Sequence, residues 1–252
     1  GGGVEVASAF ALDPNAIVLI TNRTSYSLPE TRLGIYPGLR GTLTFPQIIY
    51  KKTGDAELAV ALARYYMLSG GTASASPQLL HHLGFAQAIV PQHRRDEAAD
   101  AIASAIIHNS GKMISKDELD SLTFERLDTR MSFGDQQELH VAKDVFTQAD
   151  LLPTLFAQAR GQATLALTGE YKAIADRALR KVVNNSPNAV SVANYLISRG
   201  FEGFLNGVDN DTLAAFELEH HLRQVFEHPD ALIGLEAVVQ GRFAQFRRRY
   251  PF

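Results

Sequence analysis

The feature that most constrains this fold is a change in the pattern of apolar and polar residues near residue 92. Before it, two short β-branched or apolar runs, residues 16–21 and 86–90, predict strands, and residues 55–68 predict an amphipathic helix between them. After it, every strongly patterned segment has helical spacing. The sequence therefore predicts an α/β region over residues 1–92 and a helical region over residues 93–252.

The helical region has one weakly patterned part. Residues 112–143 are polar and show no clear period, so we expect them to be flexible. Several of the other segments begin with a residue that commonly caps a helix, such as Ser186 before Pro187. The predicted helices cover residues 96–108, 147–160, 170–183, 187–198, 211–226 and 230–246.

Composition excludes several classes of protein. The 252 residues contain no Cys, which rules out disulfides, thiolate metal ligands and a cysteine nucleophile. A net charge of −3 argues against a nucleic-acid-binding surface over the whole molecule. The apolar runs are far shorter than the ~20 residues of a membrane span, and no secretory signal pattern is present. We expect a cytoplasmic protein that binds neither nucleic acid nor membrane.

Histidine pairs give no support for a metal site. His81 and His82, like His220 and His221, are adjacent on predicted helices and lack a second histidine four residues away. Adjacent helical residues point in different directions, so such pairs are poor bidentate ligands. We expect no metal ion.

The N-terminus combines a glycine run with an acidic residue. Gly1-Gly2-Gly3 leads into a predicted helix over residues 4–12, and glycine at a helix N-terminus lets a ligand approach exposed amides closely. Glu5 lies in the first turns of this helix, and Glu30 follows Pro29 in a turn. Each acid alone predicts an ordinary surface carboxylate. Two carboxylates that lie close together could act as general acid and general base on a single water molecule.

Residues 28–42, LPETRLGIYPGLRGT, resemble the signature of the enoyl-CoA hydratase/isomerase (crotonase) superfamily. Residues 1–5, GGGVE, resemble the family's GGG-x-E, and residues 68–91 resemble a later stretch that ends in VVP. The resemblance is specific over residues 1–91. The positions that match the family's PE-x-x-LG-x-x-PG-x-GGT pattern are Pro29, Glu30, Leu33, Gly34, Pro37, Gly38, Gly41 and Thr42.

This resemblance implies a crotonase-like α/β fold, a ββα spiral of which residues 1–92 would form the C-terminal part. Residues 93–252 would then serve trimerisation and cover the acyl-CoA. The other half of the spiral would precede Gly1 or come from another chain. The family implies an acyl-CoA substrate, no separate cofactor because coenzyme A is part of that substrate, and a homo-oligomer, either a trimer or a hexamer.

The resemblance also implies roles for individual residues. The amide of Gly2 would be one of two oxyanion-hole donors, and Glu5 and Glu30 would match the two catalytic glutamates of the hydratases. Pro29, Leu33 and Gly38 would contact the substrate. Together these residues imply hydration of a 2-enoyl-CoA thioester or the reverse dehydration. Arg40 stands where the family has glycine, and we expect its side chain to reach solvent.

Other activities stay open. The tail resembles the 3-hydroxyisobutyryl-CoA hydrolase branch, which uses the glutamate matching Glu30 and an aspartate eight residues later, where this chain has Gly38. An isomerase would need only Glu30, and an acyl-CoA-binding module without catalysis is a further alternative. Because the site residues favour water addition, we place the hydratase first. The tail positions that resemble the hydrolase branch are Ser186, Pro187, Thr212, Leu213, Glu217, Glu219 and residues 228–234.

Overall fold

The computed structural model describes residues 2–70, 75–109, 111–112, 114–122, 124–148, 150–159 and 171–246, without the side chains of residues 2–6, 116, 158–159 and 220–222. The described helices are α1 (Gly2–Leu12), α2 (Gly41–Thr53), α3 (Ala56–Leu68), α4 (Pro77–His82), α5 (Arg95–His108), α6 (Lys116–Ser121), α7 (Phe133–Phe146), α8 (Leu151–Ala159), α9 (Lys172–Asn184), α10 (Pro187–Leu205), α11 (Asn210–Phe226) and α12 (Pro229–Val239). Strands β1 (Leu19–Thr21) and β2 (Ala88–Val90) and the 3-10 turns η1 (Glu30–Leu33) and η2 (Gln92–Arg94) complete the set.

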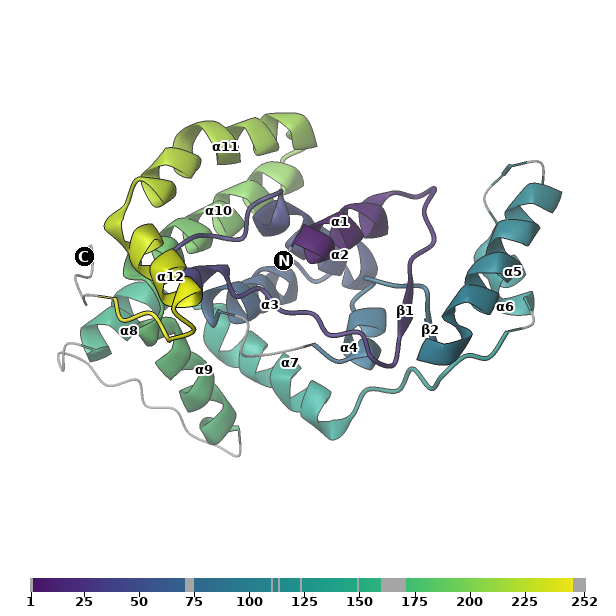
Figure 1. The fold of residues 1–252 in the computed structure, drawn as a ribbon, viewed down its shortest axis with the longest axis horizontal. Helices are drawn as coiled ribbons and strands as arrows, with labels where there is room; N and C mark the ends of the chain where they lie inside the picture. Colours follow the sequence, from purple (N-terminus) through teal and green to yellow (C-terminus); the bar gives the residue numbers. More distant parts are fainter. Residues whose placement is uncertain are drawn as a thin grey trace.

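Helix α3 forms the centre of the molecule. It packs against α2, α7 and α10, and these helices surround it in Figure 1. Its apolar residues are buried on several sides, including Ala59, Leu62 and Tyr66 at 0% exposure. A helix that is apolar around its circumference must be enclosed by neighbours, so α3 is the core element to which the other helices dock.

The two strands pair in parallel and are shorter than predicted. Leu19 lies opposite Ala88, and Thr21 lies opposite Val90. Within the described ranges the chain is mostly helical, with this pair as its one sheet. The α/β prediction is therefore confirmed only in its coarse form, because the fuller ββα spiral is absent from these ranges.

Three helices lie where the sequence pattern predicted none. Helix α2 contains Pro46, which weakened the helical pattern, yet it packs against both α1 and α3. Helix α6 and most of α7 lie within residues 112–143, the stretch that we expected to be flexible. Both begin with capping boxes, Ser115 with Glu118 and Ser132 with Asp135, and these pairs were the sequence signals for their starts.

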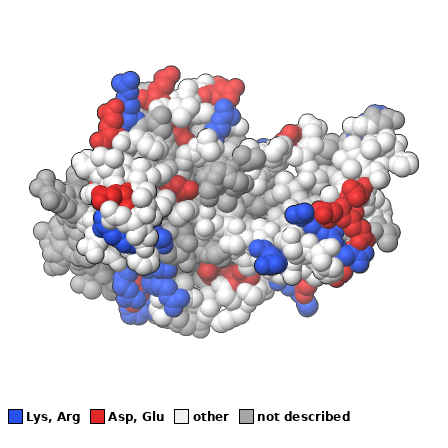
Figure 2. Space-filling model, in the orientation of Figure 1, with Lys and Arg blue, Asp and Glu red and all other residues white. Residues whose placement is uncertain are grey.

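Charged side chains of both signs are scattered over the face shown in Figure 2. Of the helices that the structure describes, none is long and apolar enough to cross a membrane.

Helix α12 meets the turn η1 through two glycines. A Cβ added to Gly234 would lie 1.8 Å from the carbonyl oxygen of Leu33, and one added to Gly34 would lie 2.2 Å from that of Asp230. Gly34 also has a left-handed φ of 79°, which glycine adopts without strain. The tail and the motif segment thus touch backbone to backbone, a contact that has no room for a side chain.

We expect Gly234→Ala to lower the free energy of unfolding by about 1–3 kcal/mol, because its methyl group would force the two backbones apart. Urea denaturation measures this change. The matched control is Gly38→Ala, where an added Cβ meets nothing within 4 Å. We expect the control to change stability by no more than about 0.5 kcal/mol. Equal stability of Gly234→Ala and the unmodified chain would contradict the close contact.

Candidate active site

Glu30 begins the turn η1 and is only 9% exposed. Its carbonyl oxygen accepts a hydrogen bond from the backbone N–H of Ile35 at 3.1 Å, which closes the turn around it. Pro29 and Leu33, on either side, are half-buried. Glu30 is therefore not the surface carboxylate that its turn position alone would predict.

The residue next to Glu30 is anchored in the core. The Thr31 hydroxyl donates to the carbonyl oxygen of Met67 at 2.7 Å. Asn185 Nδ2 donates to the carbonyl oxygen of Leu68 at 2.8 Å and to Thr31 Oγ1 at 3.3 Å. The last carbonyls of a helix lack partners within it, so these bonds complete the end of α3 and fix η1 upon it.

The other predicted catalytic groups lie at the start of α1. Gly2 is the first residue of this helix and Glu5 lies within it, but Gly1 and the side chain of Glu5 are outside the described part of the chain. The meeting of Glu5, the Gly2 amide and Glu30 therefore stays a prediction. One described contact links α1 to the segment before η1: the hydroxyls of Ser8 and Tyr26 form a hydrogen bond of 3.1 Å.

The loop before α2 carries backbone strain. Leu39 and Arg40 have left-handed φ values of 50° and 65°, a conformation that disfavours residues with a side chain by about 1–2 kcal/mol each. Gly38, immediately before them, is half-buried, and nothing lies within 4 Å of the place where its Cβ would be. The backbone at Gly38 thus borders open space, while the two residues after it are held in an unfavourable conformation.

Helix α11 holds this strained loop in place. Arg40 Nη2 forms an ion pair with Asp211 Oδ1 at 2.9 Å, although the Arg40 side chain is 47% exposed. The Arg40 side chain therefore reaches solvent as expected, and it also forms a surface ion pair that the sequence did not predict. Thr42 Oγ1 donates to Glu217 Oε2 at 2.8 Å. These contacts tie α11 to the N-terminus of α2.

Glu217 is a buried acid, with 1% exposure. Burial raises its pKa, and hydrogen bonds from the Thr42 hydroxyl and the Arg40 backbone partly oppose this effect. The nearby Tyr36 is 2% exposed, and its hydroxyl has no hydrogen-bond partner among the residues that the structure describes. Burial together with Glu217 raises the pKa of Tyr36 above the usual 10.0. The sequence pattern assigned Glu217 no role beyond the tail resemblance. The available signal for its burial was its spacing of three and four residues from Ala214 and Leu213, which places all three residues on one face of the helix.

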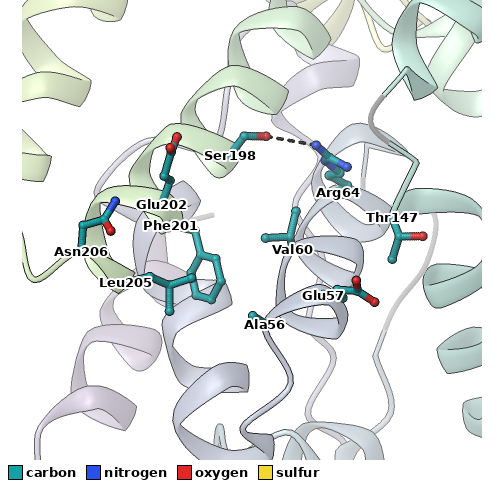
Figure 3. Close-up of a pocket in the computed structure, with 10 residues that line it drawn as sticks. All are labelled: Ala56, Glu57, Val60, Arg64, Thr147, Ser198, Phe201, Glu202, Leu205 and Asn206. Carbon is teal, nitrogen blue, oxygen red and sulfur yellow. Dashed lines mark hydrogen bonds between the residues drawn. The ribbon is translucent and has the colours of Figure 1, made fainter.

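A separate cleft of about 520 Å³ lies between α3 and α10 (Figure 3). Its walls are largely apolar, and none of the predicted site residues lines it. Arg64, 8% exposed, closes one end and donates to Ser198 Oγ at 3.1 Å and to the carbonyl oxygen of Phe146 at 2.9 Å. Because Phe146 ends α7, the guanidinium group stabilises the negative end of that helix dipole. The cleft residues are Ala56, Glu57, Val60, Arg64, Thr147, Ser198, Phe201, Glu202, Leu205 and Asn206.

The described residues contain no group of three or more His, Asp or Glu side chains that could hold a metal ion. The chemistry that this arrangement offers is that of a buried carboxyl group, backbone amides and a strained loop.

We expect Arg40→Gly to be more stable than Arg40→Ala by about 1–2 kcal/mol, because only glycine relieves the left-handed strain. Both variants lose the ion pair with Asp211, so their comparison isolates the backbone effect. Urea denaturation of the two variants measures the difference. A third variant, Asp211→Asn, removes the exposed ion pair together with a favourable charge in the first turn of α11, and should lose about 0.2–1 kcal/mol. Equal stability of the glycine and alanine variants would show that position 40 is not strained.

We expect Glu217→Gln to change how stability depends on pH. Because the pKa of Glu217 is higher in the folded protein than its ordinary 4.5, the folded state keeps a proton that the unfolded chain has lost. Glu217 therefore makes the free energy of unfolding fall as pH rises from 4.5 through its raised pKa. In Glu217→Gln this fall should disappear, as measured by urea denaturation across that range. The control, Glu219→Gln, alters an exposed acid on the same helix and should leave the wild-type fall in place.

Comparisons with known proteins support the fold. No family model matches the sequence, and no curated protein matches it significantly. A solved structure, that of a carnitinyl-CoA dehydratase from Mycobacterium thermoresistibile, matches 95% of this chain with a TM-score of 0.61 and 19% identity. The chain spans 58% of the length of that protein. At this identity the likeness shows a shared fold, and it agrees at that level with the crotonase-like fold expected from the sequence.

Proposed function

We propose that this chain is an acyl-CoA enzyme that hydrates a 2-enoyl-CoA thioester, or dehydrates the 3-hydroxyacyl product. The observation that carries the proposal is the buried Glu30 carboxyl group at the start of the motif turn. It is supported by the likeness in fold to a protein described as a carnitinyl-CoA dehydratase. Coenzyme A is part of the substrate, so the reaction needs no additional cofactor.

In the proposed mechanism, the Gly2 amide donates a hydrogen bond to the thioester carbonyl oxygen. Glu5 and Glu30 hold one water molecule between them. One carboxylate removes a proton from the water as its oxygen attacks the β-carbon, and the electrons of the double bond move toward the carbonyl oxygen. The amide stabilises the negative charge on that oxygen, and a carboxyl group then protonates the α-carbon.

The described contacts favour a shared site for α1 and η1. Ser8 lies three residues after Glu5, and residues at this spacing share one face of a helix. Ser8 is buried and bonds to Tyr26, which lies four residues before Glu30. The face of α1 that contains position 5 therefore packs toward the segment that leads into η1.

Substrate contacts are proposed at Pro29, Leu33 and Gly38. These residues lie along the motif segment and are half-buried, as expected of a binding surface that is covered only when substrate is present. At Gly38 the open space beside the Cα lets a ligand approach the backbone amide.

We also propose that the chain works as a homo-oligomer, a trimer or hexamer, with the other half of the ββα spiral supplied by a preceding segment or another chain. Exposed apolar residues on α12 support an interface, because contiguous apolar patches commonly mark contact sites. They include Leu232 at 70%, Val238 at 54% and Val239 at 87% exposure.

We expect Glu5→Gln and Glu30→Gln each to lower kcat/KM for 2-enoyl-CoA hydration by about 10²–10⁴-fold, because each removes a group that moves a proton. The rate is measured with the complete protein, from the fall in absorbance as hydration removes the conjugated double bond of the thioester. Glu57→Gln, an exposed acid on α3, is the control and should retain the wild-type rate.

The same assay separates the alternatives. Release of free coenzyme A thiol from a 3-hydroxyacyl-CoA would indicate the hydrolase. Double-bond migration that needs Glu30 but not Glu5 would indicate the isomerase. Tight acyl-CoA binding without turnover would indicate a binding module. Wild-type hydration rates in both glutamine variants would rule out the two-glutamate site.

A further inference from the structure

Three cationic side chains lie where α9 ends beside η1, since Asn185, the residue that follows α9, donates a hydrogen bond to Thr31 of η1. Arg177 and Lys181 lie one helical turn apart on α9, and Arg32 lies on η1. Among the described residues none of the three has a carboxylate within ion-pair distance. Lys172, by contrast, pairs with Asp176 at 2.9 Å on the same helix. The cluster is therefore a local excess of positive charge on a chain whose net charge is −3.

The charges of Arg177 and Arg32 both act on Lys181. The pKa of Lys181 is lowered, first by partial burial and then by the charges of Arg177 and Arg32. Arg32 also lies over the ring of Phe243, with 5.1 Å between Cζ and the ring centroid. In Figure 2, blue side chains gather over the region that α9 occupies in Figure 1. A bound anion would supply the missing opposite charge and relieve this repulsion.

A small cavity lies beside this cluster. It has a volume of about 160 Å³ and is lined by residues of α3, α7 and α9, including Arg177 and Lys181. Gln137 and Tyr65 also line it. A cavity of this size holds about five waters at ~30 Å³ each, which is enough for a phosphate group and too little for a long acyl chain.

One acid also borders the cavity. Glu138 accepts a hydrogen bond from the Tyr66 hydroxyl at 2.8 Å, and burial raises its pKa. Burial thus disfavours the charged form of Glu138, and the hydrogen bond from the buried Tyr66 partly opposes this effect. Two cations and one acid therefore line the cavity, which leaves a net positive charge there.

We infer that Arg177, Lys181 and Arg32 form a binding site for a phosphate-bearing anion, at the junction of α9 and η1. Arginine and lysine both bind phosphate oxygens through charge-assisted hydrogen bonds. The site is distinct from the cleft between α3 and α10, whose lining shares no residue with it. Its ligand is either free diphosphate or the phosphates of a nucleotide, and the inference does not depend on the proposed hydratase activity.

Titration calorimetry at low salt tests this site in the full chain, with inorganic diphosphate and adenosine 3′,5′-bisphosphate as the two probes. We expect Lys181→Gln and Arg177→Gln each to weaken binding about tenfold or more. Lys172→Gln, which alters an exposed and already paired lysine on the same helix, should change it less than about twofold. Tighter binding of one probe identifies the source of the phosphate.

NMR titration of the Lys181 side chain provides a second readout. Diphosphate should raise the pKa of its amine, because an adjacent anion favours the charged form. Thermal unfolding without ligand checks that the variants fold. Failure of both probes to bind at millimolar concentration, or equal affinity in the Lys181→Gln, Arg177→Gln and Lys172→Gln variants, would overturn the site. Neither result bears on Glu30, whose substitution is tested by hydration alone.

Discussion

The contact between η1 and α12 determines how the motif segment is held. Two backbones approach each other at Gly34 and Gly234 with no space for a side chain, and Ser186 reinforces the junction through its 2.6 Å bond to Asp230. Since η1 begins with Glu30, the position of this carboxyl group depends on helices more than 150 residues later in the chain. The tail is thus part of the candidate active site's support.

A second support comes from α11. Leu39 and Arg40 adopt a left-handed conformation that a non-glycine residue does not favour by itself. Asp211 and Glu217 contact the side chain of Arg40 and the hydroxyl of Thr42, and they offset part of this strain. Strained backbone often persists at functional sites because surrounding structure enforces it. Arg40, which stands where the family pattern has glycine, is therefore held by a residue of α11, in the C-terminal part of the chain.

The charged groups of the molecule fall into two contrasting environments. Glu217 and Tyr36 are buried under the motif loop, where the low dielectric favours their neutral forms. Arg177 and Lys181 lie at a surface cavity, where their charges repel one another and attract an anion. Both environments border the segment of residues 29–42. Arg40 and Thr42 act on Glu217, and Arg32 acts on Lys181.

The sequence by itself determined the features that have local causes. The apolar pattern predicted α3, the Ser186 cap predicted the start of α10, and the spacing of prolines and glycines identified the motif segment around Glu30. Only the tertiary structure decided that Glu217 meets Thr42 across 175 residues and that Arg40 pairs with Asp211. A periodic pattern states which face of a helix is buried, but the partner of that face is chosen by packing, which no local pattern encodes.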